Sequence, residues 1–173
     1  MLREAAQVVG YLEAHDVACA VIGGVALGAH GIARATLDVD ILVADPSVLE
    51  PGFWARLAGR RPPEIRRGDP DDPLLGVARF ATETLAVDII VGRPPLAGDI
   101  VSRRILLDVG VGRLPFADRG DLILLKLLAG GPQDLLDIEL LLAADPTVRA
   151  IVEERLGGAP PHVCETWHAR FAR

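Results

Sequence analysis

The stretch that decides the fold is residues 21–43, VIGGVALGAHGIARATLDVDILV. Its pattern predicts a strand, a glycine turn, a short helix and a second strand. Asp38 and Asp40 lie in the second strand, where residues two apart project from the same face about 6.6 Å from each other. The alternation places apolar residues on the other face, toward a core: Leu37, Val39 and Ile41. We therefore expect two carboxylates on one side of a half-buried strand.

Two neighbouring carboxylates repel each other unless they are protonated or neutralised by a cation. Mg²⁺ suits such a pair, because it takes one or two carboxylates and completes its shell with water and substrate phosphate oxygens. Gly23 and Gly24 would let the backbone turn sharply, and the first N–H groups of the following helix attract phosphate. The glycines alone are equally explained by a tight strand-to-helix turn without a ligand. Together with the acids, they predict a site for a cation and a phosphate.

The Gly-Gly pair, thirteen intervening residues and the Asp-Val-Asp run resemble the signature of the DNA polymerase β-like nucleotidyltransferase superfamily. Residues 34–40, RATLDVD, resemble the version found in AbiE-type abortive-infection toxin nucleotidyltransferases and their bacterial relatives. The resemblance implies a third acid on a neighbouring strand, and Asp88 in the apolar run LAVDIIVG matches it. Taken without the pair, Asp88 would be an edge or hydrogen-bonded residue.

The C-terminal third carries a second set of candidates. Lys126 is the only lysine of the chain and lies in the apolar run LILLKLL. The resemblance implies contact with the nucleotide phosphates, whereas the residues alone also fit an aliphatic stem whose ammonium reaches water. The resemblance further implies an acid that assists catalysis in the next helix, for which Asp134 is a closer match than Asp137. Here Gln133 precedes it, where the family usually has Arg or Lys.

The resemblance implies transfer of a nucleoside monophosphate from an NTP to an acceptor hydroxyl. The residues expected to hold Mg²⁺ or Mn²⁺ are Asp38, Asp40 and Asp88. The residues expected to act in catalysis are the same three acids and Asp134. The residues expected to bind the NTP are Gly23, Gly24, Arg34 and Lys126. For Arg34, an ion pair that orients an active-site aspartate is an equal alternative.

Length, composition and charge limit the classes of protein to which the chain can belong. The chain has 173 residues, enough for one domain, and is 50% hydrophobic but only 4% aromatic, so aliphatic residues must build the core. Two cysteines are too few for a disulfide framework, no leader is recognisable, and the longest apolar runs are about half a membrane span. We therefore expect a cytoplasmic protein without a membrane segment. The net charge of −6 argues against a broad nucleic-acid surface but leaves room for a local basic patch at Arg60, Arg61, Arg66 and Arg67.

The predicted fold class is α/β (α+β), a mixed β-sheet flanked by helices with a short helical C-terminal part. Residues 1–115 would form the nucleotidyltransferase sheet domain, and residues 116–173 a helical part packed on it as a single compact unit. Asp45 and Pro46 predict a helix over 47–57. Short strands are expected at 64–67, 75–81, 85–91, 104–109 and 111–115. The turn of the central hairpin is placed at 82–84 and a linker at 93–98.

Three function classes remain open at this point. The first is a toxin-like enzyme that modifies RNA or protein and has a cognate antitoxin. The second is a small-molecule adenylyltransferase of the antibiotic-modifying kind. The third is a degenerate fold that serves as a binding or antitoxin subunit without enzymatic activity. The complete acid set argues against the third class, and the motif does not encode the acceptor.

Overall fold

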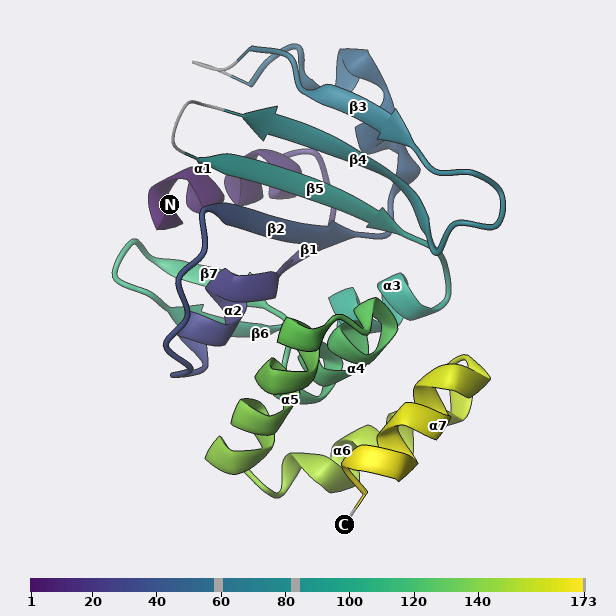
Figure 1. Cartoon of the computed structure of the whole chain (residues 1–173). Helices are drawn as coiled ribbons and strands as arrows, with labels where there is room; N and C mark the ends of the chain where they lie inside the picture. Colours follow the sequence, from purple (N-terminus) through teal and green to yellow (C-terminus); the bar gives the residue numbers. More distant parts are fainter. Residues whose placement is uncertain (58–60, 82–84, 173) are drawn as a thin grey trace.

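The computed structural model describes residues 1–57, 61–81 and 85–172. Within these ranges, seven strands form one sheet in the order β3-β4-β5-β2-β1-β7-β6 (Figure 1). β2 runs parallel to β5 and β1 parallel to β7, whereas the other neighbours are antiparallel. The predicted mixed sheet flanked by helices is confirmed.

The strands are β1 (Cys19–Ile22), β2 (Asp38–Val43), β3 (Glu64–Arg67), β4 (Leu74–Ala81), β5 (Ala86–Gly92), β6 (Ile105–Asp108) and β7 (Arg113–Phe116). The α-helices are α1 (Leu2–Glu13), α2 (Gly23–Ala29), α3 (Leu96–Ser102), α4 (Arg119–Ala129), α5 (Pro132–Ala144), α6 (Val148–Arg155) and α7 (Pro161–Arg170). Short 3-10 helices are η1 (Pro46–Leu49), η2 (Pro51–Trp54) and η3 (Leu156–Gly158). The expected turn at 82–84 lies outside the described residues.

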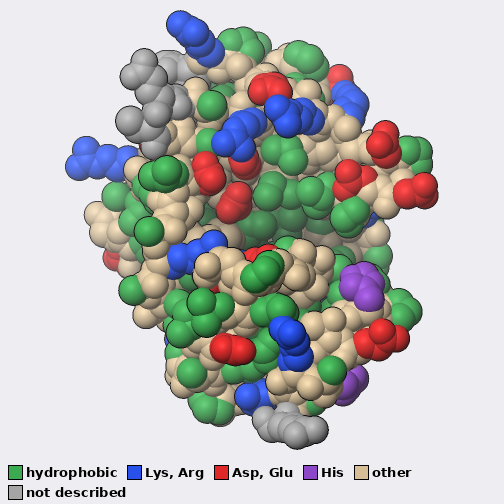
Figure 2. Space-filling view, viewed as in Figure 1, with side chains coloured by type: hydrophobic (Ala, Val, Ile, Leu, Met, Phe, Trp, Pro, Cys, Tyr) green, Lys and Arg blue, Asp and Glu red, His purple; other side chains and the backbone are tan. Residues whose placement is uncertain are grey.

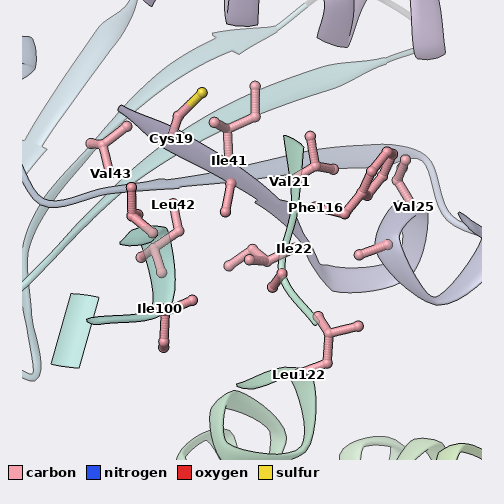
Figure 3. Close-up of a cluster of buried hydrophobic side chains, with 14 of the residues drawn as sticks. Cys19, Val21, Ile22, Val25, Ile41, Leu42, Val43, Ile100, Phe116 and Leu122 are labelled. Carbon is pink, nitrogen blue, oxygen red and sulfur yellow. The ribbon is translucent and has the colours of Figure 1, made fainter. Parts of the chain in front are cut away.

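Aliphatic side chains fill the core, as the composition predicts. Figure 3 shows a cluster of buried side chains from the central strands and from α2, α3 and α4, to which Cys19 and the aromatic Phe116 also belong: Cys19, Val21, Ile22, Val25, Ile41, Leu42, Val43, Ile100, Phe116 and Leu122. Val39 and Ile41 are fully buried, as the alternation requires. The prediction for Leu37 is wrong, because its side chain is 73% exposed. β2 begins only at Asp38, so the alternation does not extend back to Leu37.

An aromatic cluster closes one face of the sheet. Trp54 stacks on Tyr11 of α1 and meets Phe80 of β4 edge to face. The single helix predicted over 47–57 is wrong, since η1 and η2 divide this segment. The cause is Pro51, which lacks an N–H donor and holds the preceding Glu50 in an extended conformation (φ −85°, ψ 128°). The predicted cap is present, because the Asp45 side chain accepts a hydrogen bond from the Ser47 N–H.

α3 was not predicted, because residues 93–98 read as a linker and the helix begins inside it at Leu96. Both prolines of this stretch precede the helix, so they leave its hydrogen-bond ladder intact. α3 packs closely on β5: a Cβ on Gly92 would lie 2.6 Å from the Ala97 Cβ. α3 therefore covers the far ends of β2 and β5 and leaves the ends with the predicted acids accessible.

Four helices, α4 to α7, follow the sheet in the described chain and lie together below it (Figure 1). A buried arginine–aspartate network ties α3, α4 and α6 to one another. Arg103 binds Asp121 through Nε and Nη2 at 3.0 and 2.8 Å, and Arg155 binds Asp118 through both Nη atoms at 2.6 and 2.8 Å. β7 extends to Phe116, one residue beyond the boundary predicted at residue 115. The division of the chain at that boundary into a sheet domain and a helical part stays an interpretation. In the described ranges, no helix has the length and apolarity to cross a membrane.

Candidate active site

Three carboxylates lie together on the face of the sheet opposite the aromatic cluster. β2 and β5 are adjacent and parallel, and their register sets Asp40 directly beside Asp88. Asp38 lies two residues before Asp40 and so projects from the same face. The predicted placement of the third acid on a neighbouring strand is therefore observed. We call this group of Asp38, Asp40 and Asp88 the acid face.

The acid face is accessible. Figure 2 shows acidic side chains gathered beside basic ones over the sheet half of the molecule, above a hollow that separates them from the C-terminal helices. The Asp38 side chain is 50% exposed and that of Asp88 is 13% exposed. A ligand arriving from solvent thus meets Asp38 first and Asp88 deeper in the site.

Arg79 of β4 is a member of the site that the sequence analysis missed. It lies directly opposite Asp88 in the β4–β5 pair. Its Nη1 is 2.8 Å from Asp88 Oδ2, and its Nη2 is 3.6 Å from Asp38 Oδ1. A signal existed, since Arg79 is a lone cation in the apolar run LLGVARFA, but its partner is set by a register that the local pattern does not reveal.

The acids are incompletely neutralised. Burial raises the pKa of Asp40 to about 6, and the neighbouring Asp88 and Asp38 charges add to the rise, while Lys126 and Arg34 oppose it. Burial also raises the pKa of Asp88, against the opposing charge of Arg79. Both shifts mean that the site resists holding three negative charges without a further cation.

The donor atoms suit a hard divalent cation, since Mg²⁺ and Mn²⁺ prefer carboxylate oxygens. Asp88 Oδ1 is buried and has no hydrogen-bond partner among the described residues, which is the state expected of an oxygen reserved for a ligand. Within the described ranges, however, no three His, Cys, Asp or Glu side chains are gathered closely enough to hold a metal ion. Arg79 is ion-paired with both Asp38 and Asp88. The residues fit a cation once the guanidinium moves aside.

The glycine pair is explained by close packing. Gly23 has a φ of +67°, and a Cβ there would lie 2.0 Å from Asp40 Oδ2. A Cβ on Gly24 would lie 2.8 Å from the Thr36 Cβ. Thr36 in turn donates from its hydroxyl to the Asp38 carbonyl at 3.1 Å. Gly23 and Gly24 therefore let the turn close over the acid strand, and their contact with phosphate stays a prediction.

A second charged cluster, formed by Arg34, Lys126, Asp134 and Asp137, lies where α4 meets α5. Asp137 is fully buried, and it accepts from Arg34 at 2.5 Å and pairs with Lys126 at 2.6 Å. Lys126 also binds Asp134 Oδ1 at 2.8 Å. The ammonium therefore does not reach out to water, because the Lys126 side chain is 9% exposed and held by two carboxylates.

The sequence analysis favoured Asp134 over Asp137, whereas in the structure Asp137 has the more central place in this cluster. Asp134 accepts the Gly131 N–H at 3.2 Å, so part of its role is to cap α5. Asp137 is the central acceptor, and Gln133 also donates to it at 3.2 Å. Arg34 orients Asp137 and, among the described residues, is not ion-paired with Asp38 or Asp40, although its charge lowers the pKa of Asp40. The catalytic role of Asp134 stays a prediction.

The predicted basic patch is divided by the sheet. Arg66 lies on the same face as Arg79, because Glu64 of the same strand is the register partner of Arg79. Arg67 points to the other side, where it binds Glu50 at 2.8 Å and the Leu49 carbonyl at 3.3 Å. Arg60 lies outside the described residues. The expectation of a single patch with Arg67 in it is wrong, because neighbouring strand residues face opposite ways.

Comparisons with solved structures identify the fold of this protein. No family model and no curated protein matches the sequence. Among solved structures, the Thermotoga maritima protein TM1012, a candidate nucleotidyltransferase, is 14% identical with a TM-score of 0.53, covering 88% of this chain and 92% of its own. The antibiotic-resistance factor ANT(2'')-Ia is 11% identical with a TM-score of 0.52, covering 95% of both chains.

A third similar structure is an antigenic nucleotidyltransferase-like protein from Paracoccidioides brasiliensis. It is 13% identical with a TM-score of 0.51, covering 99% of this chain and 97% of its own. All three likenesses span nearly the whole chain. The protein therefore has the nucleotidyltransferase fold, including its C-terminal helices, while identities this low establish the fold alone.

Proposed function

We propose that this protein is a nucleotidyltransferase that depends on Mg²⁺ or Mn²⁺ and transfers a nucleoside monophosphate from an NTP to an acceptor hydroxyl. The observation that carries the proposal is the acid face: three aspartates on adjacent strands, two with raised pKa values, on a fold shared with nucleotidyltransferases. A folding role alone would not favour such a group, because uncompensated carboxylates destabilise the native state.

Each residue has a defined part in this proposal. Asp38, Asp40 and Asp88 would hold the cation, which when bound supplies Lewis-acid activation of the phosphate and neutralises developing charge. Asp88 would orient the acceptor hydroxyl for in-line attack on the α-phosphorus. Gly23 holds the turn against Asp40 and so fixes that carboxylate.

The second cluster would serve the triphosphate. Lys126 and Arg34 carry positive charge close enough to favour ionisation of the neighbouring acid Asp40, because both lower its pKa. Asp137 and Asp134 would hold the ammonium in place until phosphate oxygens share it. Positioned cations of this kind stabilise charge that moves onto a leaving pyrophosphate.

The acceptor has two candidates. The similarity to ANT(2'')-Ia over 95% of both chains favours a small molecule, such as an antibiotic hydroxyl. The division of the arginine patch and the net charge of −6 also weaken the case for RNA. The motif RATLDVD supports the other candidate, a toxin that modifies RNA or protein and is controlled by an antitoxin. Either reaction draws on NTP and would take place in the cytoplasm.

The test is transfer of label from α-³²P NTPs, with Mg²⁺ or Mn²⁺, to three separate pools: total RNA, cell protein and hydroxyl-bearing antibiotics. We expect label in one pool with wild-type protein and none with Asp40→Asn. The pool that is labelled identifies the acceptor class. Failure of every pool, together with an unfolding temperature that does not change when Mg²⁺ and NTP are added, would overturn the proposal.

A further inference from the structure

Arg79 occupies the position from which a cation would act on the acid face. Its guanidinium reaches Asp88 Oδ2 at 2.8 Å and Asp38 Oδ1 at 3.6 Å, so it spans the two outer carboxylates. Among the described residues, Arg79 is the cationic side chain that is ion-paired with these two acids. It therefore supplies part of the neutralisation that the acid face needs.

The strand register fixes the base of this side chain. Arg79 is the cross-strand neighbour of Asp88, and its own neighbours Ala78 and Phe80 are buried on the other face of the sheet. The outer end is less constrained, because the Arg79 side chain is 42% exposed. The guanidinium can thus leave the acids for solvent without moving β4.

An alternative partner lies beside it. Glu64 of β3 is the register partner of Arg79 on the side away from Asp88. Its side chain is 60% exposed and is engaged by Arg66. A guanidinium released from the acid face would thus find a carboxylate on the same face of the sheet.

A divalent cation and Arg79 make incompatible demands on the same oxygens. Cation ligation by Asp38 and Asp88 would use the oxygens that the guanidinium now engages, and two positive groups at that separation would repel each other. In this structure the guanidinium engages one oxygen of each carboxylate, Asp38 Oδ1 and Asp88 Oδ2.

We propose that Arg79 is a displaceable counter-ion, which holds the acid face in order when the site is empty and competes with the divalent cation for Asp38 and Asp88. This inference rests on the proposed function for the cation site. It makes Arg79 a positioning residue, whose removal weakens the empty site and strengthens cation binding.

The experiment is a direct titration of Mn²⁺ followed by the electron paramagnetic resonance signal of the free ion. It compares wild type, Arg79→Met and Arg67→Met. Arg67 is the matched control, because it is a similarly exposed arginine that points to the other face of the sheet and pairs with Glu50. We expect the dissociation constant for Mn²⁺ to fall on the order of fivefold in Arg79→Met, as removal of weak, partly exposed pairs would give, and to change little in Arg67→Met.

Arg79→Lys gives a second readout if the methionine variant folds poorly. A lysine keeps the charge but loses the fork that spans two carboxylates, so we expect Mn²⁺ affinity between those of wild type and Arg79→Met. Equal or weaker Mn²⁺ binding by the Arg79 variants, with clear binding by wild type, would overturn the inference and leave the proposed function standing. A wild-type protein that binds no Mn²⁺, alone or with NTP, would overturn both.

Discussion

The acid face and the arginine–aspartate network are built from the same residue types but are neutralised differently. In the network, two carboxylates, Asp118 and Asp121, meet two guanidiniums, and Asp121 is fully buried. On the acid face, the guanidinium of Arg79 pairs with two of the three carboxylates, Asp38 and Asp88, and Asp88 Oδ1 has no hydrogen-bond partner among the described residues. The pKa shifts follow this division, since the network lowers the pKa of Asp118, whereas burial and like charges raise that of Asp40 to about 6.

This difference separates a structural charge cluster from a functional one. Burial of ions is tolerated in the network because each carboxylate has its own cation and hydrogen bonds. The acid face keeps an excess of negative charge at an accessible surface, which costs stability and is best explained by a ligand that supplies the missing positive charge. The comparison therefore predicts opposite responses when one acid is removed from each cluster.

The largest effect is expected in the network. Asp121→Asn would leave Arg103 and Arg155 facing a neutral buried amide, and the free energy of unfolding should fall by about 3–5 kcal/mol. Urea unfolding measures this, with the exposed Asp71→Asn as control, expected within about 0.5 kcal/mol of wild type. Mn²⁺ binding at low temperature should be retained. A loss of Mn²⁺ affinity in a folded Asp121→Asn protein would contradict the separation of the arginine–aspartate network from the acid face.

Asp40→Asn should act in the opposite direction when divalent cations are removed. A carboxyl whose pKa is raised in the folded state binds its proton more tightly there than in the unfolded chain, so its contribution to stability falls as pH rises from about 4 through about 6. At pH 7.5 the asparagine variant should be more stable than wild type by on the order of 2 kcal/mol.

The difference between Asp40→Asn and wild type should shrink toward pH 4, where Asp40 is protonated in the folded state and about half protonated in the unfolded chain. Urea unfolding at both pH values, with a chelator present, provides the measurement. The variant should also lose the stabilisation that Mn²⁺ and NTP give to wild type. Lower stability of Asp40→Asn than of wild type at pH 7.5, or a stability difference that does not change with pH, would mean that the negative charges of the acid face are already neutralised.

Lys126→Met extends the comparison to the second charged cluster, where α4 meets α5. If the ammonium is shared with phosphate, NTP affinity should fall by about 1.5–3 kcal/mol. Stability should fall as well, because Asp134 and Asp137 lose a partner. Isothermal titration calorimetry measures the affinity, with Arg119→Met as control, since Arg119 pairs with Asp145 elsewhere in the helices. Equal NTP affinity in the Lys126 variant and wild type would assign Lys126 to folding only.

The smallest effect is expected at the glycine turn. Gly23→Ala places a Cβ at φ +67° against Asp40, and the left-handed conformation alone costs about 1–2 kcal/mol. Gly28→Ala in α2 is the matched control, because its Cβ would meet open space and a helical alanine adds roughly 0.5–1 kcal/mol. Weaker Mn²⁺ binding in Gly23→Ala alone would show that the turn fixes Asp40. Equal behaviour of the two variants would remove Gly23 from the site.

Local pattern predicted the parts of the fold that depend on neighbours in sequence. The period-two alternation placed Asp38 and Asp40 on one face, whereas Asp88 was located through the resemblance, which implied a third acid on a neighbouring strand. The division of residues 47–57 was missed because the prediction gave the cap at Asp45 too much weight and Pro51 too little. α3 was missed because its prolines lie before the helix and were read as a linker.

The partners of the acids depend on distant elements and could not be predicted in the same way. Arg79 meets Asp88 only through the β4–β5 register, and the burial of Asp137 depends on how α5 packs against α4 and Arg34. Sequence spacing carries no record of these tertiary contacts. The sequence therefore located the carboxylates together with Arg34 and Lys126, whereas Arg79 and the pairing of each acid with its cation became visible only in three dimensions.

The central claim is that the excess negative charge of the acid face is matched by a divalent cation with its NTP. The most direct measurement is a crystal structure with Mn²⁺ and a non-hydrolysable NTP analogue, in which anomalous scattering locates the metal. The account predicts an anomalous peak within ligation distance of Asp38, Asp40 and Asp88, with Arg79 withdrawn from them. A peak elsewhere, or an acid face still occupied by Arg79 while the nucleotide is bound, would contradict it.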